Sequence, residues 1–77
     1  MPANIVTSGT GDDTIVYDKP VGYLSIFVAS GVTFEFSLDK GTTYITLPDG
    51  FHSFPIGSVT EIHIAADGEW QILAVRA

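Results

Sequence analysis

The chain contains no cysteine, and only Lys19, Lys40 and Arg76 carry a positive charge among its 77 residues. The absence of cysteine excludes a disulfide and a thiolate metal site. Nine acidic residues bring the net charge to −6 at pH 7, which repels phosphate backbones and anionic lipid surfaces. Nucleic-acid binding needs a basic stripe, which three scattered cations cannot form. We therefore expect neither a nucleic-acid nor a membrane partner.

Long apolar segments are also missing. No apolar run approaches the length of a membrane span, and the N-terminal sequence MPANIVTSGTG lacks the basic and apolar regions of a signal peptide. We expect a soluble chain that is made in the cytoplasm of its host. No segment of ten residues has the 3.6-residue apolar period of a helix, because glycine interrupts every long run.

Apolar residues instead recur at every second position. The segment VTFEFSL at 32–38 places Phe34 and Phe36 on one face and Glu35 on the other, as expected of a half-buried antiparallel strand. The same alternation surrounds Trp70 near the C-terminus. We expect these three aromatic side chains to lie in the core.

Turn sequences rich in Gly, Pro and Asp separate the strands. The sequence ADGE at 66–69 predicts a hairpin, because Asp-Gly suits a type I′ turn. This spacing predicts an all-β fold, a small antiparallel β-sandwich or barrel of about seven to eight short strands, mostly hairpin-connected. Residues 1–10 are expected to form an N-terminal arm and residues 11–77 a single β domain. The expected strands lie near 4–7, 13–17, 22–28, 32–38, 42–47, 51–55, 59–66 and 69–76.

The stretch SGTGDDTIV at 8–16 resembles one calcium-binding β-roll repeat, with Gly9, Gly11, Asp13 and Ile15 in the required places. Such repeats bind calcium only when about three or more stack, and calcium takes about six to eight oxygen ligands. A single copy therefore predicts a solvated turn that leads into a strand. A calcium-stabilised domain remains an alternative, which would melt at a lower temperature in the presence of a chelator.

The two histidines, His52 and His63, are the other candidate metal ligands. Glu61 shares a strand face with His63, but the sequence offers no identifiable third ligand. We expect both histidines to be polar surface positions, and we expect no metal and no other cofactor.

No sequence motif indicates catalysis. The serines and carboxylates lie in no nucleophile elbow and no phosphate-binding loop. A chain of this size also has little room beside its core for the groove that opposed glycosidase carboxylates need. We expect no catalytic residue and no enzyme activity.

Two expected strands carry apolar residues on both faces. Tyr23 and Phe27 lie opposite the core side of one strand, and Leu73 and Val75 lie opposite the core side of the other. An exposed apolar patch marks an interface, and a domain this small gains stability from association. We expect these four residues to contact another subunit. The alternative is that both strands are central in a tightly curled barrel.

The expected arm contains one apolar pair, Ile5 and Val6. An extended arm can add a strand to the sheet edge of a neighbouring subunit. We therefore expect these two residues to be the first inter-subunit contacts. A platform of Tyr23, Tyr44 and Phe51 that binds sugar rings is the alternative use of the exposed aromatic residues.

Residues 31–64 resemble small all-β virion structural proteins of tailed bacteriophages, in which a segment S-x-D-x-G-T-T-Y joins two strands and a Pro-Gly or Asp-Gly turn follows. The resemblance implies a capsid decoration (cement) protein that binds the major capsid protein at the virion surface and stabilises the phage head. It also implies a homo-oligomer, with a trimer favoured, and no catalytic residues. The alternative is a carbohydrate- or receptor-binding module of a tail fibre or spike. The residues that carry the resemblance are Ser37, Asp39, Gly41, Thr42, Thr43 and Tyr44.

Overall fold

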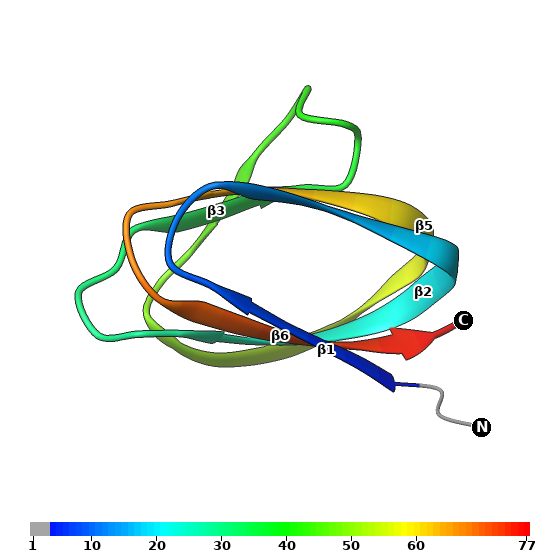
Figure 1. Ribbon diagram of the computed structural model, residues 1–77, viewed down its shortest axis with the longest axis horizontal. Coiled ribbons are helices and arrows are strands. Elements are labelled where there is room, and N and C mark those ends of the chain that lie inside the picture. The colour runs from blue at the N-terminus through cyan, green and yellow to red at the C-terminus, as the bar shows by residue number, and fades with distance from the viewer. Residues whose placement is uncertain (1–3) are drawn as a thin grey trace.

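The computed structural model describes residues 4–77, and the side chains of Asn4 and Ile5 are not described. These residues form one open antiparallel sheet with the strand order β1-β6-β2-β5-β3-β4 (Figure 1). Within the described range, no helix is present that could cross a membrane. The strands are β1 (Asn4–Gly9), β2 (Asp13–Val28), β3 (Phe34–Ser37), β4 (Ile45–Leu47), β5 (Gly50–Ala66) and β6 (Trp70–Arg76).

The two long strands, β2 and β5, bend and fold the sheet into two layers. Residues 13–16 of β2 pair with residues 61–64 of β5, whereas residues 23–28 pair with residues 50–55, and the register shifts between these two halves. Pro20 lies at the bend of β2, and Gly57 has a φ of 80° at the bend of β5. Proline and glycine weaken the ladder there and allow both strands to turn.

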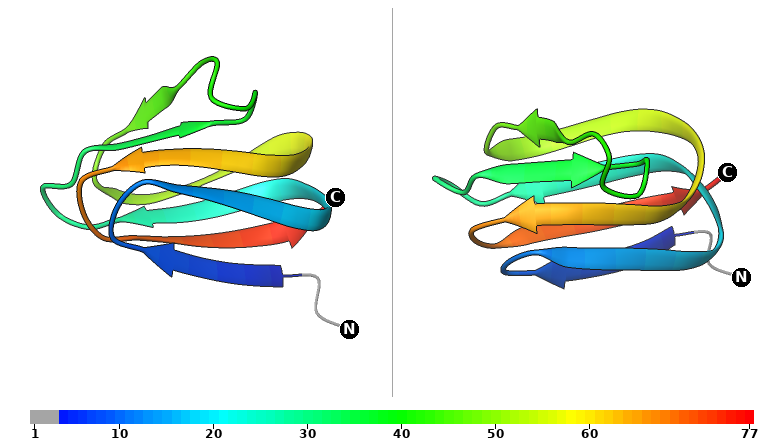
Figure 2. Two further views of the ribbon diagram at one scale, coloured as in Figure 1. Left: turned by 45° about the horizontal axis from the view of Figure 1, so that its top comes forward. Right: turned by 90° about the horizontal axis from the view of Figure 1, so that it is seen from above.

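The lower layer of Figure 1 contains β1, β6, the second half of β2 and the first half of β5. The upper layer contains the first half of β2, the second half of β5, β3 and β4. Figure 2 shows the two layers from other sides, with β1 outermost in the lower layer beyond β6.

The core lies between the two layers and depends on aromatic contacts. The ring of Phe34 packs edge-on against Trp70 at a centroid distance of 6.3 Å, and Phe36 stacks on Phe54 at 5.5 Å. In each pair, one ring comes from the upper layer and the other from the lower layer. The prediction that Phe34, Phe36 and Trp70 lie in the core is confirmed.

The expected fold class is confirmed, but the described chain forms fewer and longer strands. The segments expected at 13–17 and 22–28 are one strand, β2, and those at 51–55 and 59–66 are one strand, β5. The local proline and glycine signals are real, yet they mark bends, because strand pairing continues on both sides of them.

The connections between strands also differ from those expected, because only β3 and β4 are neighbours both in the chain and in the sheet. The ADGE turn joins the second half of β5, in the upper layer, to β6 in the lower layer. Its Asp67 carboxylate accepts a hydrogen bond from the Thr33 N–H at 2.8 Å, and a Cβ at Gly68 would lie 2.5 Å from the Val32 side chain. The turn therefore packs against the segment before β3 and does not close a hairpin.

Residues 4–9 form strand β1, which includes the strand expected near 4–7 within the expected arm of residues 1–10. They pair with β6 of the same chain, from Asn4 opposite Val75 to Gly9 opposite Trp70. Residues 1–3 lie outside the described residues. Strand β1 is one edge of the sheet, so its outer side faces away from the rest of the described chain.

Candidate interaction face

The outward side chains of the lower layer form a continuous surface, which we call the outer face. The strand register places them in three cross-strand rows, since residues directly opposite each other in a ladder share one face of the sheet. The described residues of the outer face are Val6, Ser8, Tyr23, Ser25, Phe27, Phe51, Ser53, Pro55, Gln71, Leu73 and Val75.

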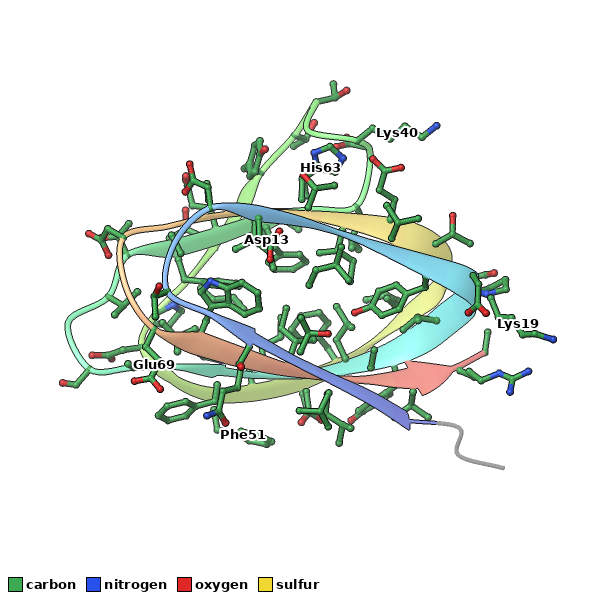
Figure 3. The ribbon with its side chains drawn as sticks, viewed as in Figure 1. Asp13, Lys19, Lys40, Phe51, His63 and Glu69 are labelled. Carbon is green, nitrogen blue, oxygen red and sulfur yellow. The ribbon has the colours of Figure 1, made fainter. Side chains whose placement is uncertain are left out.

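Large apolar side chains of the outer face are open to solvent. Val6 is 72% exposed, Phe51 69%, and Tyr23 and Phe27 40% each. Figure 3 shows Phe51 projecting away from the core beneath the lower layer. On β2, the residues that alternate with Tyr23 and Phe27 point inward and are buried, namely Leu24, Ile26 and Val28. The alternation that builds the core on this strand therefore also produces its apolar outer surface.

No described side chain of the outer face carries a charge. At its centre, Ser25 and Ser53 of neighbouring strands hydrogen-bond to each other through their hydroxyls at 2.9 Å. A partner that covered this region would desolvate no charge, and the two hydroxyls would keep a hydrogen bond. The face is therefore suited to burial against another protein surface.

The outward surface of the upper layer has the opposite character. The His63 Nε2 and the Glu61 carboxylate form a hydrogen bond there, and the Thr46 hydroxyl donates to the Glu35 carboxylate at 3.2 Å. Val16 is an exposed large apolar residue of this surface, at 70%. The two surfaces of this acidic molecule therefore differ in chemistry, and the polar one is suited to solvent.

The opening glycine and aspartate stretch is used within the fold. The carbonyl of Gly11 accepts a hydrogen bond from the Trp70 indole N–H at 2.9 Å. The Asp12 carboxylate accepts one from the Ala66 N–H at 2.9 Å, and the Asp13 carboxylate caps the Thr14 N–H at 2.8 Å. These bonds fix the turn between β1 and β2 against the start of β6 and the end of β5.

The two histidines lie in different halves of β5 and therefore in different layers. His63 lies in the half of β5 that belongs to the upper layer, beside the 38–44 loop (Figure 3). His52 lies in the other half, with its Nε2 2.7 Å from the Pro48 carbonyl oxygen. Among residues 4–77, no group of three or more His, Cys, Asp or Glu side chains is placed to hold a metal ion.

The motif that carries the bacteriophage resemblance is a self-contained turn. The Ser37 hydroxyl donates to the Asp39 carboxylate at 2.6 Å and accepts from the Gly41 N–H at 2.9 Å. The same carboxylate accepts from the Thr43 N–H at 2.8 Å. The hydrogen bonds from Ser37 and Thr43 hold the pKa of Asp39 below its ordinary value. Lys40 and Gly41 have positive φ values of 62° and 87°, so the motif fixes a loop conformation.

Five of the residues expected to contact another subunit lie together on the outer face: Val6, Tyr23, Phe27, Leu73 and Val75. The sixth, Ile5, has a side chain outside the described residues. Their contact with another subunit stays a prediction.

Phe51 also lies on this face, although the sequence predicted it only as part of the sugar-binding platform and not as a subunit contact. It is directly opposite Phe27 across the β2–β5 ladder, and both point outward. The expected platform of Tyr23, Tyr44 and Phe51 does not form, because Tyr44 lines a hollow of about 320 Å³ with Asp13 and His63 beside the upper layer. Phe51 and Phe54 are three positions apart, so strand alternation places them on opposite faces, and this could have predicted that Phe51 points outward. The pairing of Phe51 with Phe27 could not be predicted from the sequence.

No protein-family model matches the chain, and no curated protein sequence matches it. Among solved structures, that of CoII HppE in complex with Tris buffer is similar over 96% of this chain and 44% of that chain, with 21% identity and a TM-score of 0.55. The structure of hydroxypropylphosphonic acid epoxidase from S. wedmorenis in complex with fosfomycin is similar over 96% of this chain and 42% of that chain, with 18% identity and a TM-score of 0.54. The C-terminal domain of A223, a structural protein from sulfolobus turreted icosahedral virus, is similar over 96% of this chain and 94% of that chain, with 19% identity and a TM-score of 0.48.

The chain therefore spans less than half the length of the HppE and epoxidase chains that it matches. The space between its layers is filled by large apolar side chains such as Trp70, Phe34 and Leu24, and the described residues offer no cluster of metal-binding side chains. They do not fit a cobalt centre like that of CoII HppE, and the absence of enzyme activity stays a prediction. At 21% and 18% identity, the similarity to these two chains shows a common all-β fold.

Proposed function

We propose that this protein is a structural binding module that attaches to a larger protein assembly through its outer face. The observation that carries the proposal is the absence of charge from an exposed apolar sheet face in a molecule of net charge −6. In this proposal the assembly is a virion shell and the partner is the major capsid protein, as the bacteriophage resemblance of residues 31–64 implies.

The aromatic residues of the outer face supply the anchors for such attachment. Phe27 and Phe51 form a cross-strand pair, and Tyr23 lies on the same face. Aromatic side chains dominate the binding energy of protein interfaces when they are fully desolvated. The polar upper layer would then face solvent, as required of a subunit that covers the surface of a particle in many copies.

The location of the protein on particles tests the proposal. Antibodies raised against the purified chain are applied to virus particles from the source culture and visualised by immunogold electron microscopy. Regular labelling of the heads is the expected result, and particles that carry no label would contradict the proposal.

A substitution tests the role of the outer face itself. Phe51→Asp places a charge on this face, and we expect it to weaken attachment to particles stripped of the protein by at least about tenfold, or about 1.4 kcal/mol. Val16→Asp is the matched control, since Val16 is equally exposed but lies on the upper layer. Equal loss of attachment in both variants would show that the outer face is not the docking surface.

A carbohydrate- or receptor-binding module of a tail fibre or spike is the second candidate. It is favoured by the exposed aromatic group of Tyr23, Phe27 and Phe51 on one face, because sugar rings stack on aromatic side chains. This function predicts gold label at the tail end of the particle and saturable binding of a glycan on an array. It also predicts that Tyr23→Ala and Phe51→Ala abolish the glycan signal while the chain remains folded.

A further inference from the structure

Four strand segments form the lateral edges of the two layers, and three of them have features that discourage pairing with another chain. Strand β4 has only three residues and ends just before Pro48. The first half of β5 contains Pro55, which has no N–H to donate. The first half of β2 begins with Asp13, next to Asp12. Short length, proline and charge are the common means by which sheet edges avoid pairing.

Strand β1 has none of these features. It is six residues long, and its sequence NIVTSG contains no charged residue and no proline. Its register with β6 runs without a shift from Asn4 to Gly9, so no bulge twists it away from a partner. Every second residue of an edge strand directs its N–H and C=O outward, and Val6 adds a side chain that is 72% exposed.

We infer that β1 pairs in antiparallel orientation with β1 of a second copy of this chain, about a two-fold axis perpendicular to the lower layer. The other described edges are protected, so the best partner for β1 is the same strand of another molecule. Such a contact is isologous and closes at two copies. The absence of charge from β1 matters because each copy carries a net charge of −6.

This pairing would join two outer faces into one surface. A two-fold axis perpendicular to the sheet keeps the outer faces of both copies on the same side. One outer face, four strand segments wide and three rows long, covers about 400 Å² at ordinary strand spacings of about 4.8 Å and rises of about 3.3 Å. A stable interface of standard size buries about 800 Å² on each partner. The inference rests here on the proposed function, because the joined face supplies the area that docking to a shell requires.

Sedimentation equilibrium of the purified full chain is the first test. A species of twice the 8.2 kDa chain mass is expected. A single-chain mass at every accessible concentration would overturn the inference. A three-chain mass would also overturn it, in favour of the trimer that the bacteriophage resemblance implies.

A charge variant assigns the contact to β1. Val6→Lys with Ser8→Lys places two cations on the edge strand of each copy, and we expect the dimer dissociation constant to rise at least about tenfold, because like charges meet across the axis. Thr46→Lys is the control, because it introduces a lysine at the opposite sheet edge, on β4. A dimer that survives the double variant would place the contact elsewhere.

Cysteine cross-linking covers the case in which the charge variant fails to fold. The chain has no cysteine, so in variants with a single cysteine at position 6, 7 or 8, any disulfide joins the same position of two copies. Near a two-fold axis, one residue of an antiparallel pair faces its own copy at about 4.5 to 5.5 Å between Cα atoms, within disulfide range. Oxidation should give a covalent dimer most rapidly at one of these positions and not at Thr46→Cys. Equal rates at all four positions would contradict the pairing.

The two proposals fail separately. Phe51 lies on β5, at the side of the lower layer opposite to β1, so Phe51→Asp should leave the two-chain mass unchanged while it weakens attachment to particles. A dimer that attaches to no particle would contradict the proposed function alone. A single chain that attaches to particles would contradict the β1 pairing alone.

Discussion

The hydroxyl of Tyr17 is buried at the bend of β2 and has no hydrogen-bond partner among the described residues. Burial raises the pKa of this phenol above its ordinary value. A buried polar group without a partner costs about 1 to 3 kcal/mol of stability. We expect Tyr17→Phe to raise the free energy of unfolding by about 1 kcal/mol, as measured by urea denaturation. A decrease would show that the hydroxyl is hydrogen-bonded in solution.

Gly9 is required by a neighbouring side chain. A Cβ at this position would lie 2.6 Å from the indole ring of Trp70, which is buried and held by the Gly11 carbonyl. We expect Gly9→Ala to lower the free energy of unfolding by about 1 to 3 kcal/mol, the usual cost of overpacking a core. Gly11→Ala is the control, because the nearest atom to its Cβ would be 4.0 Å away. Equal effects of both substitutions would contradict the contact.

These residues explain what the glycines of the opening stretch do. Sequence reasoning predicted a turn there and offered calcium as the alternative, but it could not show that Gly9 makes room for Trp70. The two residues are 61 positions apart in the chain and meet only because β1 pairs with β6. A local pattern indicates where a turn lies, whereas its contacts depend on the strand order.

At the scale of single elements, the 38–44 loop between β3 and β4 depends on the ionised Asp39 carboxylate. The folded pKa of Asp39 lies below its unfolded value, so its contribution to stability is present above about pH 4 and is lost as pH falls through the lowered pKa. We expect Asp39→Asn to lower the melting temperature at pH 7, with a smaller difference from the parent chain as the pH approaches 2.

The matched control for this loop is Asp18→Asn, which removes the same charge from another exposed position. Melting curves of the parent and both variants across this pH range give the measurement. A difference between the parent and Asp39→Asn that stays constant with pH would show that the carboxylate contributes through its shape and not through its charge.

Strand alternation in the sequence predicted some features of the strands and not others. Alternation correctly placed Phe34, Phe36 and Trp70 in the core, and it predicted the apolar outer positions of Tyr23, Phe27, Leu73 and Val75. It could not predict that β2 and β5 continue through their bends, because proline and glycine look the same at a bend and at a strand end. The pairing of Phe27 with Phe51 depends on the continuation of β2 and β5 through their bends, so it could not be predicted from the sequence pattern either.

At the scale of the whole molecule, charge and apolar surface are separated. The acidic residues lie outside the outer face and outside β1, so two copies that pair through β1 repel each other mainly at long range. This repulsion is screened by salt, since the Debye length falls from about 30 Å at 0.01 M to about 8 Å at 0.15 M. The paired β1 strands contain no charged residue, so they form no ion pair that salt could weaken.

We therefore expect dimerisation to strengthen with salt, by about tenfold or more between about 0.01 and 0.15 M sodium chloride for two bodies of charge −6. Sedimentation equilibrium at several salt concentrations gives the association constants, and a parallel series with a chelator tests the calcium alternative. Association that weakens with salt would indicate ion pairs between the copies, which the uncharged β1 cannot supply. The contact would then have to involve the acidic residues of the upper layer and the few cations of the chain.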